Sequence, residues 1–169
     1  MTRYELDPDR SQVWIEGTSS VHPIHATATG LTGWVEVTMR SGRLTAEPTF
    51  DGEVRVAVDR LRSGNPLVDR ETKRRVDARR HPEIVGTVVT ASREDDDRVA
   101  VTGDIAFRGE VSRVEGSITV ALDGAELVLE GSQRFDVRDW GLQPPKVAML
   151  RVHPDIEVRV HLVGHRVDG

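Results

Sequence analysis

Hydrophobic and polar residues alternate with period two along most of the chain, which is the pattern of β-strands with one buried face. In GEVRVAVDRL, Val54, Val56 and Val58 fall on one face, while Arg55 and Asp59 fall on the other. The same alternation runs through SQVWIEG, GWVEVTM, EIVGTVVTAS, DRVAVTGDIAFRG, SRVEGSITVAL, AELVLEGSQRFDV and DIEVRVHLVGH. Ser-Gly and Asp-Gly pairs separate several of these runs, as tight turns require. The pattern predicts an all-β protein of roughly eight or nine short strands, either a sandwich or a closed antiparallel barrel.

One segment, GNPLVDRETKRRVDARRHP, lacks the alternation and carries helix signals instead. Asn65 is a suitable N-cap, Pro66 suits the first helical position, and Pro82 would stop a helix. We therefore predict one short helix over residues 66–80, lying across one end of the strands. The sequence contains no linker or internal repeat, so we expect residues 1–169 to form a single domain.

Composition and charge remove several classes of protein. The chain has no cysteine, which excludes disulfide scaffolds, thiolate metal sites and cysteine nucleophiles. Its formal net charge of -5 disfavours a nucleic-acid partner, because a negative protein repels phosphate backbones. No run approaches the roughly 18 apolar residues of a membrane span. The first residues also carry no apolar leader. We therefore expect a cytoplasmic protein without integral membrane association.

Several segments, taken in their order and spacing, resemble the YceI-like family. The chain begins with YELDPDRSQVWIEG, and Gly30 follows His22 at a spacing of eight residues. The crossover SGNPLVDRETKRRVDARRHPEI, the strand-turn-strand segment VTGDIAFRGEVSRV and the segment FDVRDWGLQPP come next. The resemblance covers nearly the whole chain. It implies a lipocalin-like antiparallel β-barrel whose elongated apolar cavity holds a polyisoprenoid or a similar long-chain amphiphile, and it implies that homodimers are common. We expect no cofactor.

If such a barrel is hollow, its alternating apolar positions supply the wall that contacts the ligand. The positions expected to point inward are Val54, Val56, Val58, Val101, Ile105, Phe107, Ile118, Val120, Val158 and Val160. The alternative is a barrel filled by its own side chains, which would serve as a ligand-free interaction module.

The predicted helix carries an excess of basic side chains. Arg74 and Arg75 are therefore candidates for contacting an anionic head group at the barrel rim. A solvated helix face explains the same charges, and we favour it.

The histidine pair His22 and His25 invites a comparison with metal sites. A spacing of three sends two strand side chains to opposite faces, and Pro23 argues against a helix, so we expect no metal site here. His22, which matches the histidine of the family, is a candidate either for the ligand head group or for backbone hydrogen bonds at a strand end. We favour the structural role.

Trp14 and Trp34 share strand faces with Glu16 and Glu36, respectively. The two tryptophans are candidates for lining the cavity, and the alternation leaves open whether they cover the outer wall instead. The two glutamates, on neighbouring strands, would form a buried carboxylate pair suited to acid-base chemistry. This pair is the basis of an enzyme hypothesis, which ranks below a non-catalytic carrier because the sequence has no G-x-S-x-G or H-E-x-x-H motif.

Overall fold

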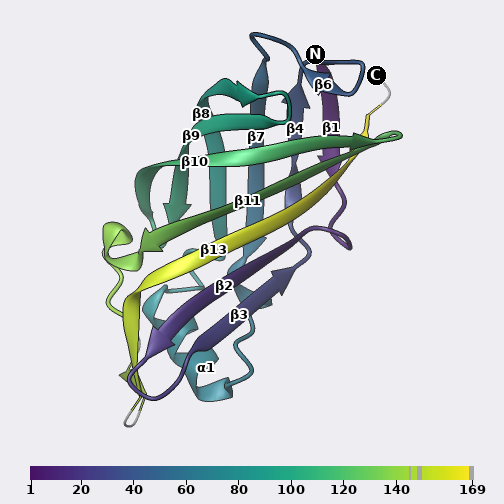
Figure 1. Cartoon of the computed structure of the whole chain (residues 1–169). Coiled ribbons are helices and arrows are strands. Elements are labelled where there is room, and N and C mark those ends of the chain that lie inside the picture. The colour runs from purple at the N-terminus through teal and green to yellow at the C-terminus, as the bar shows by residue number, and fades with distance from the viewer. Residues whose placement is uncertain (145, 148–149, 168–169) are drawn as a thin grey trace.

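The alternating segments pair with their neighbours in chain order and close into an eight-stranded antiparallel barrel (Figure 1). The structure is a computed structural model that describes residues 1–144, 146–147 and 150–167. Its strands are β1 (Thr2–Leu6), β2 (Gln12–Ser19), β3 (Ile24–Thr29), β4 (Thr32–Val37), β5 (Met39–Arg40), β6 (Arg43–Leu44), β7 (Phe50–Ala57), β8 (Glu83–Asp95), β9 (Arg98–Phe107), β10 (Glu110–Asp123), β11 (Glu126–Asp136), β12 (Lys146–Val147) and β13 (Leu150–Arg166). Its helices are the 3-10 turns η1 (Val58–Arg60) and η2 (Val137–Trp140) and the α-helix α1 (Pro66–Arg75). The predicted all-β, lipocalin-like barrel with one short helix is confirmed.

Two of the eight strand positions of the barrel are each formed by two successive strands, β1 with β2 and β3 with β4. β1 pairs with β4, and β2 pairs with β3, so these four strands form one long hairpin that is interrupted in the middle. β13 pairs with both β1 and β2, with Tyr4 opposite Arg166 at one end and Glu16 opposite Glu157 further along. Because the last strand pairs with the first, the sheet has no free edge at this seam.

The helix α1 follows β7 and η1 and lies at the end of the barrel opposite the two chain termini (Figure 1). The Asn65 side chain caps it by accepting hydrogen bonds from the backbone N–H groups of Leu67, at 3.0 Å, and Val68, at 3.3 Å. The helix ends at Arg75, so the predicted span of 66–80 is too long. Asp77 has a φ of 52°, a left-handed conformation in which the α-helix cannot continue. No helix among the described residues is long and apolar enough to cross a membrane.

Buried side chains gather in two clusters. The main cluster lies toward the end of the barrel that holds both termini, and the small second cluster lies at the α1 end. The buried members of the main cluster are Tyr4, Leu6, Val13, Ala28, Leu31, Val35, Val37, Leu44, Phe50, Val99, Val120, Leu127, Leu129 and Leu162. Those of the second cluster are Val58, Val76 and Leu142. Partly buried side chains of the wall, among them Val54, Val101 and Val158, pack against the main cluster.

Candidate functional site

The inner wall of the barrel carries most of the apolar positions that the alternation singled out. In the ladders, Val54 lies opposite Gly86, and Gly86 lies opposite Ile105, so these three residues share the inner face. Five further residues pack against the main cluster, one is a member of it, and one packs against the second cluster. The five are Val56, Val101, Ile118, Val158 and Val160; Val120 is a member of the main cluster, and Phe107 packs against the second. Nine of the ten residues expected on the wall therefore face the interior.

The remaining residue, Val58, does not belong to the wall. It lies in η1 after the end of β7, is 1% exposed, and packs with Val76 and Leu142 in the second cluster. The expectation that it lines a cavity is wrong because the strand ends one residue before it, and the alternation of a strand no longer governs its direction.

The inward side chains differ in exposure along the barrel axis. Toward the terminal end, Val99 and Val120 are only 0% and 1% exposed. In the middle, Val54, Val101 and Val158 remain partly accessible although the wall surrounds them. The inward side chains are therefore less completely covered in the middle of the barrel than at its terminal end.

Gly86 gives direct evidence for unfilled space in the interior. A Cβ atom built on Gly86 would meet no other atom within 4 Å, although the residue lies on the inner face of β8 between β7 and β9. Interiors that are packed shut leave few voids of this kind. The interior beside Gly86 is therefore unfilled, and we call this space the hollow.

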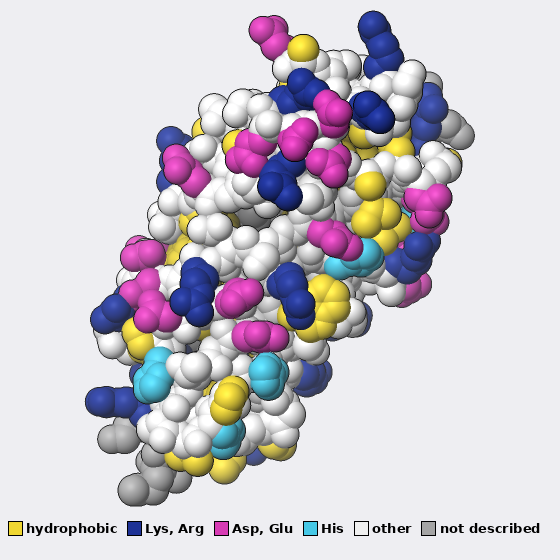
Figure 2. Space-filling view, in the orientation of Figure 1, with side chains coloured by type: hydrophobic (Ala, Val, Ile, Leu, Met, Phe, Trp, Pro, Cys, Tyr) yellow, Lys and Arg dark blue, Asp and Glu magenta, His cyan; other side chains and the backbone are white. Residues whose placement is uncertain are grey.

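The wall opens where β10 and β11 separate. The ladder between these strands ends with Ile118 opposite Gly131. Beyond it, a recess of about 550 Å³ reaches from β8, β9 and β10 to Gln133 of β11 across Gly116. Figure 2 shows the surface hollowed between β10 and β11. We call this feature the window recess.

The lining of the window recess is mainly polar, with apolar contributions from β8 and β9. Glu94 and Glu115 bring carboxylates to it, and the Ser117 hydroxyl donates to the Glu94 carboxylate at 2.9 Å. Among the described residues that line it, none is basic. A recess of this composition repels an anionic group and offers hydrogen-bond partners to an uncharged one.

Arg74 and Arg75, the expected head-group contacts, both bind Glu71 within α1. The Arg74 Nη2 lies 2.6 Å and the Arg75 Nε 2.9 Å from the Glu71 Oε1. The hydrogen bonds from the two guanidinium groups, that of Arg74 first, hold the pKa of the Glu71 carboxyl below its ordinary value. The two arginines are therefore occupied within the helix, as the solvated-face alternative expects.

His22 lies exposed in the turn between β2 and β3. Its Nδ1 is 2.8 Å from the Pro23 carbonyl oxygen, and its backbone N–H donates to the Ser19 hydroxyl at 3.0 Å. These contacts fit the structural role. His25 points to the Glu16 carboxylate, with 3.8 Å between its Nδ1 and the Oε1. Nowhere in the described part of the chain do three histidine or acidic side chains converge as metal ligands would.

Trp14 and Trp34 lie on the outer wall. The Arg159 guanidinium lies 5.2 Å from the centre of the Trp14 ring, and the Arg3 guanidinium lies 4.5 Å from that of Trp34. Because their neighbours Val13 and Val35 belong to the main cluster, alternation directs both indoles outward. The expectation that they contact a ligand inside the barrel is therefore wrong.

The proposed carboxylate pair does not form. Glu16 lies in β2, which pairs with β13 and β3, whereas Glu36 lies in β4, which pairs with β1 and β7. Glu16 lies 4.0 Å from Arg159, and Glu36 lies 3.4 Å from Arg3. The two carboxylates belong to strands that are not neighbours, and each faces an arginine.

Sequence reasoning missed two residues of this site, Gly86 and Gln133. Both occupied inward positions of runs that the alternation had already identified, EIVGTVVTAS and AELVLEGSQRFDV. A glycine and an amide at core-facing positions of a strand are the signals that would have found them, because each departs from the apolar pattern.

Comparison with known proteins agrees with this geometry. The model of the YceI-like domain matches residues 4–164. BcnA of Burkholderia cenocepacia has a similar structure, with a TM-score of 0.78 at 16% identity, covering 94% of this chain and 98% of that one. A polyisoprenoid binding domain from Saccharophagus degradans, implicated in plant cell wall breakdown, also has a TM-score of 0.78, at 13% identity, with 99% and 100% covered.

The YceI protein of Campylobacter jejuni has a TM-score of 0.65 at 10% identity, with 85% of each chain covered. No curated protein sequence matches this chain. At such identities the solved structures establish the shared barrel fold, while the sequence match extends over nearly the whole chain. The chain therefore belongs to the YceI-like domain family.

Proposed function

We propose that the protein is a carrier that holds a long-chain isoprenoid or fatty amphiphile in the hollow of its barrel and returns it chemically unchanged. The observation that carries this proposal is the unfilled space at Gly86, surrounded by inward valines that remain partly accessible. The similar fold of a polyisoprenoid binding domain supports the same class of ligand. The enzyme alternative rested on a pairing of Glu16 with Glu36 that the structure lacks.

Burial alone provides enough free energy for such binding. At about 0.8 kcal/mol per methylene, a tail of some 20 carbons gains roughly 16 kcal/mol on leaving water. Ordering the tail and restricting its translation oppose much of this gain. The remainder is compatible with submicromolar affinity without any specific hydrogen bond, so an apolar wall of valine and isoleucine suffices.

The polar end of the ligand is placed, in this proposal, at the window recess. Glu94 and Glu115 would repel a phosphate or carboxylate there, whereas Gln133 and Ser117 offer hydrogen bonds to a hydroxyl or carbonyl group. We therefore expect uncharged isoprenoids, such as prenols and quinones, to bind more tightly than fatty acids of equal length.

Native mass spectrometry of the freshly purified protein, followed by solvent extraction, tests the proposal. A stoichiometric isoprenoid or acyl species, recovered unchanged after incubation, is the expected result. An apo mass that stays apo after incubation with a prenol, a quinone and palmitate would overturn the carrier and favour a ligand-free interaction module. A chemically altered lipid would overturn the non-catalytic role.

A further inference from the structure

The end of the barrel that carries α1 is strongly basic in an otherwise acidic protein. Residues 60–81 contain eight lysine or arginine side chains and three aspartate or glutamate side chains, whereas the whole chain has a net charge of -5. At the opposite end, the last residues of β8 and its turn to β9 form the entirely acidic run Glu94–Asp97. The excess of positive charge is therefore local to the segment around α1.

Three of these cations surround a second recess, of about 420 Å³, beside the first turns of α1. Its lining residues are Arg62, Pro66, Asp69, Arg70 and Lys73, and we call it the basic recess. Among the described residues, no carboxylate lies within ion-pair distance of the three basic groups, in contrast to Arg74 and Arg75.

The remaining polar contacts of the basic recess are local. The Asp69 carboxylate accepts a hydrogen bond from the Ser63 backbone N–H at 3.0 Å, which ties the loop to the helix. Arg62 donates to the carbonyl oxygens of Asp59 and Leu61. Neither contact neutralises the positive charge of the recess by an ion pair, so the recess retains an excess of positive charge for an external anion.

Large apolar side chains are exposed at the same end. Leu67, which is 55% exposed, lies one turn before Arg70 on the outer face of α1. Val21, in the turn between β2 and β3, is 66% exposed. A soluble anion would gain nothing from these side chains, whereas a lipid bilayer offers both phosphate groups and an apolar layer beneath them.

We propose that the α1 end of the barrel docks on an anionic phospholipid bilayer, with a lipid phosphate in the basic recess and Leu67 in the interface. Such docking would place the barrel against the phase in which its apolar ligand dissolves. The inference concerns the outer surface alone, so vesicle binding is expected whether or not the hollow is occupied. The docking proposal can therefore fail while the carrier proposal stands, and the carrier proposal can fail while docking is observed.

The strength of docking follows from the number of unpaired cations. Each lysine or arginine near an anionic leaflet raises the binding constant about fivefold. Removing the charges of Arg70 and Lys73 together should therefore lower vesicle binding about 25-fold. The attraction should also weaken as salt shortens the Debye length, which is about 10 Å at 0.1 M.

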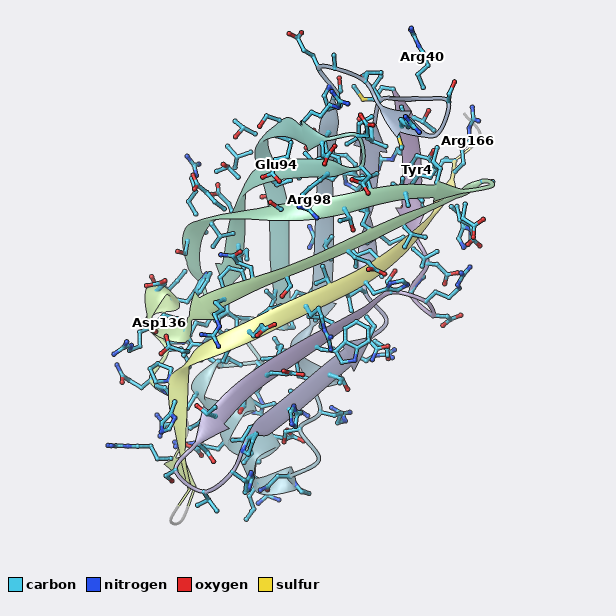
Figure 3. The ribbon with its side chains drawn as sticks, viewed as in Figure 1. Tyr4, Arg40, Glu94, Arg98, Asp136 and Arg166 are labelled. Atoms are coloured by element: carbon cyan, nitrogen blue, oxygen red, sulfur yellow. The ribbon has the colours of Figure 1, made fainter. Side chains whose placement is uncertain are left out.

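The proposal is tested by sedimentation with phosphatidylcholine vesicles that either contain about 30 mol% of the anionic lipid phosphatidylglycerol or lack it. The variant R70Q/K73Q is compared with R40Q/R166Q, which removes equal charge. Figure 3 labels Arg40 and Arg166 at the end of the barrel away from α1. Neither arginine forms an ion pair with a carboxylate among the described residues. Circular dichroism of each variant serves as the control for folding.

The expected result is binding to anionic vesicles only, with the large loss in R70Q/K73Q and wild-type binding in R40Q/R166Q. Equal losses in the two variants, equal binding to neutral vesicles, or no vesicle binding would each overturn the proposal. A parallel titration with inorganic phosphate separates the sources of the anion. Saturation of the basic recess by free phosphate, without vesicle binding, would assign it to a soluble phosphate instead.

Discussion

Filling the hollow from Gly86 is the most direct test of where the ligand lies. The substitution Gly86→Phe places an aromatic ring on the inner face of β8, where a Cβ atom would meet nothing within 4 Å. The backbone at this position is ordinary extended strand, so the new side chain requires no unusual φ. Replacing a glycine within a strand also removes a source of instability. We therefore expect the ligand-free variant to be at least as stable as the wild type.

The loss of affinity can be estimated from the space that the ring occupies. A benzyl group displaces a ligand segment of about five methylenes, and each methylene contributes about 0.8 kcal/mol on burial. The loss is then about 4 kcal/mol, which corresponds to roughly a thousandfold increase in Kd. A shorter side chain should have a smaller effect, so Gly86→Val should lie between the wild type and Gly86→Phe.

The assay is a titration with a fluorescent polyene or a prenol, read by ligand fluorescence and by native mass. Ala121→Phe is the matched control, because Ala121 lies exposed on the outer face of β10, next to the inward Val120. This control adds the same apolar ring without entering the hollow. It should bind as the wild type does.

Folded Gly86→Phe protein that binds with wild-type affinity would refute the placement of the ligand in the hollow. Equal losses in Gly86→Phe and Ala121→Phe would point to an effect on the fold or on the outer surface. If Gly86→Phe does not fold, the Gly86→Val variant still decides the question through its intermediate affinity.

Three further predictions concern the frame that holds the site. Trp140 is 4% exposed and donates its indole N–H to the Ile105 carbonyl at 2.9 Å, so the substitution Trp140→Ala should lower the free energy of unfolding by about 4 kcal/mol. Urea titration should show less than half that loss for Trp140→Phe, and equal losses would contradict a role of ring volume. Asn65→Ala removes the α1 cap and should cost about 1 kcal/mol by the same measurement, with Asn65→Asp as the near-neutral control. The hydrogen bond with His165 lowers the pKa of Asp7 below 3.8, so the stability it provides is present above that pH and lost below it; Asp7→Asn should therefore destabilise the protein at pH 7 but not once the wild-type carboxylate is protonated, and a pH-independent difference in unfolding free energy would contradict this linkage.

Much of the secondary structure follows from local sequence. Period-two alternation identified the strands, and Asn65 and Pro66 identified the start of α1, because both signals act over a few neighbouring residues. The end of the helix did not follow in this way. Asp77 adopts a left-handed conformation, and the sequence before Pro82 contains no residue type that would have predicted a helix end there.

Alternation also placed residues on opposite faces of each strand without deciding which face is inside. Val13 and Trp14 illustrate the difference. The sequence separates them, but only the pairing of β2 with β13 and β3 puts Val13 into the main cluster and Trp14 under the outer Arg159. Apolar character was a poor guide here, because a tryptophan under an arginine is stable at a surface.

The sequence by itself determined that this chain is a β protein with apolar inner positions, a basic helix and the segments of the YceI-like family. The tertiary structure alone decided that the space at Gly86 stays unfilled, that β10 and β11 part beyond Ile118, and that Arg62 joins Arg70 beside α1. The reason is that local patterns arise from the geometry of adjacent residues. A hollow, a window or a recess instead depends on the register between strands far apart in the chain, which no short stretch of sequence specifies.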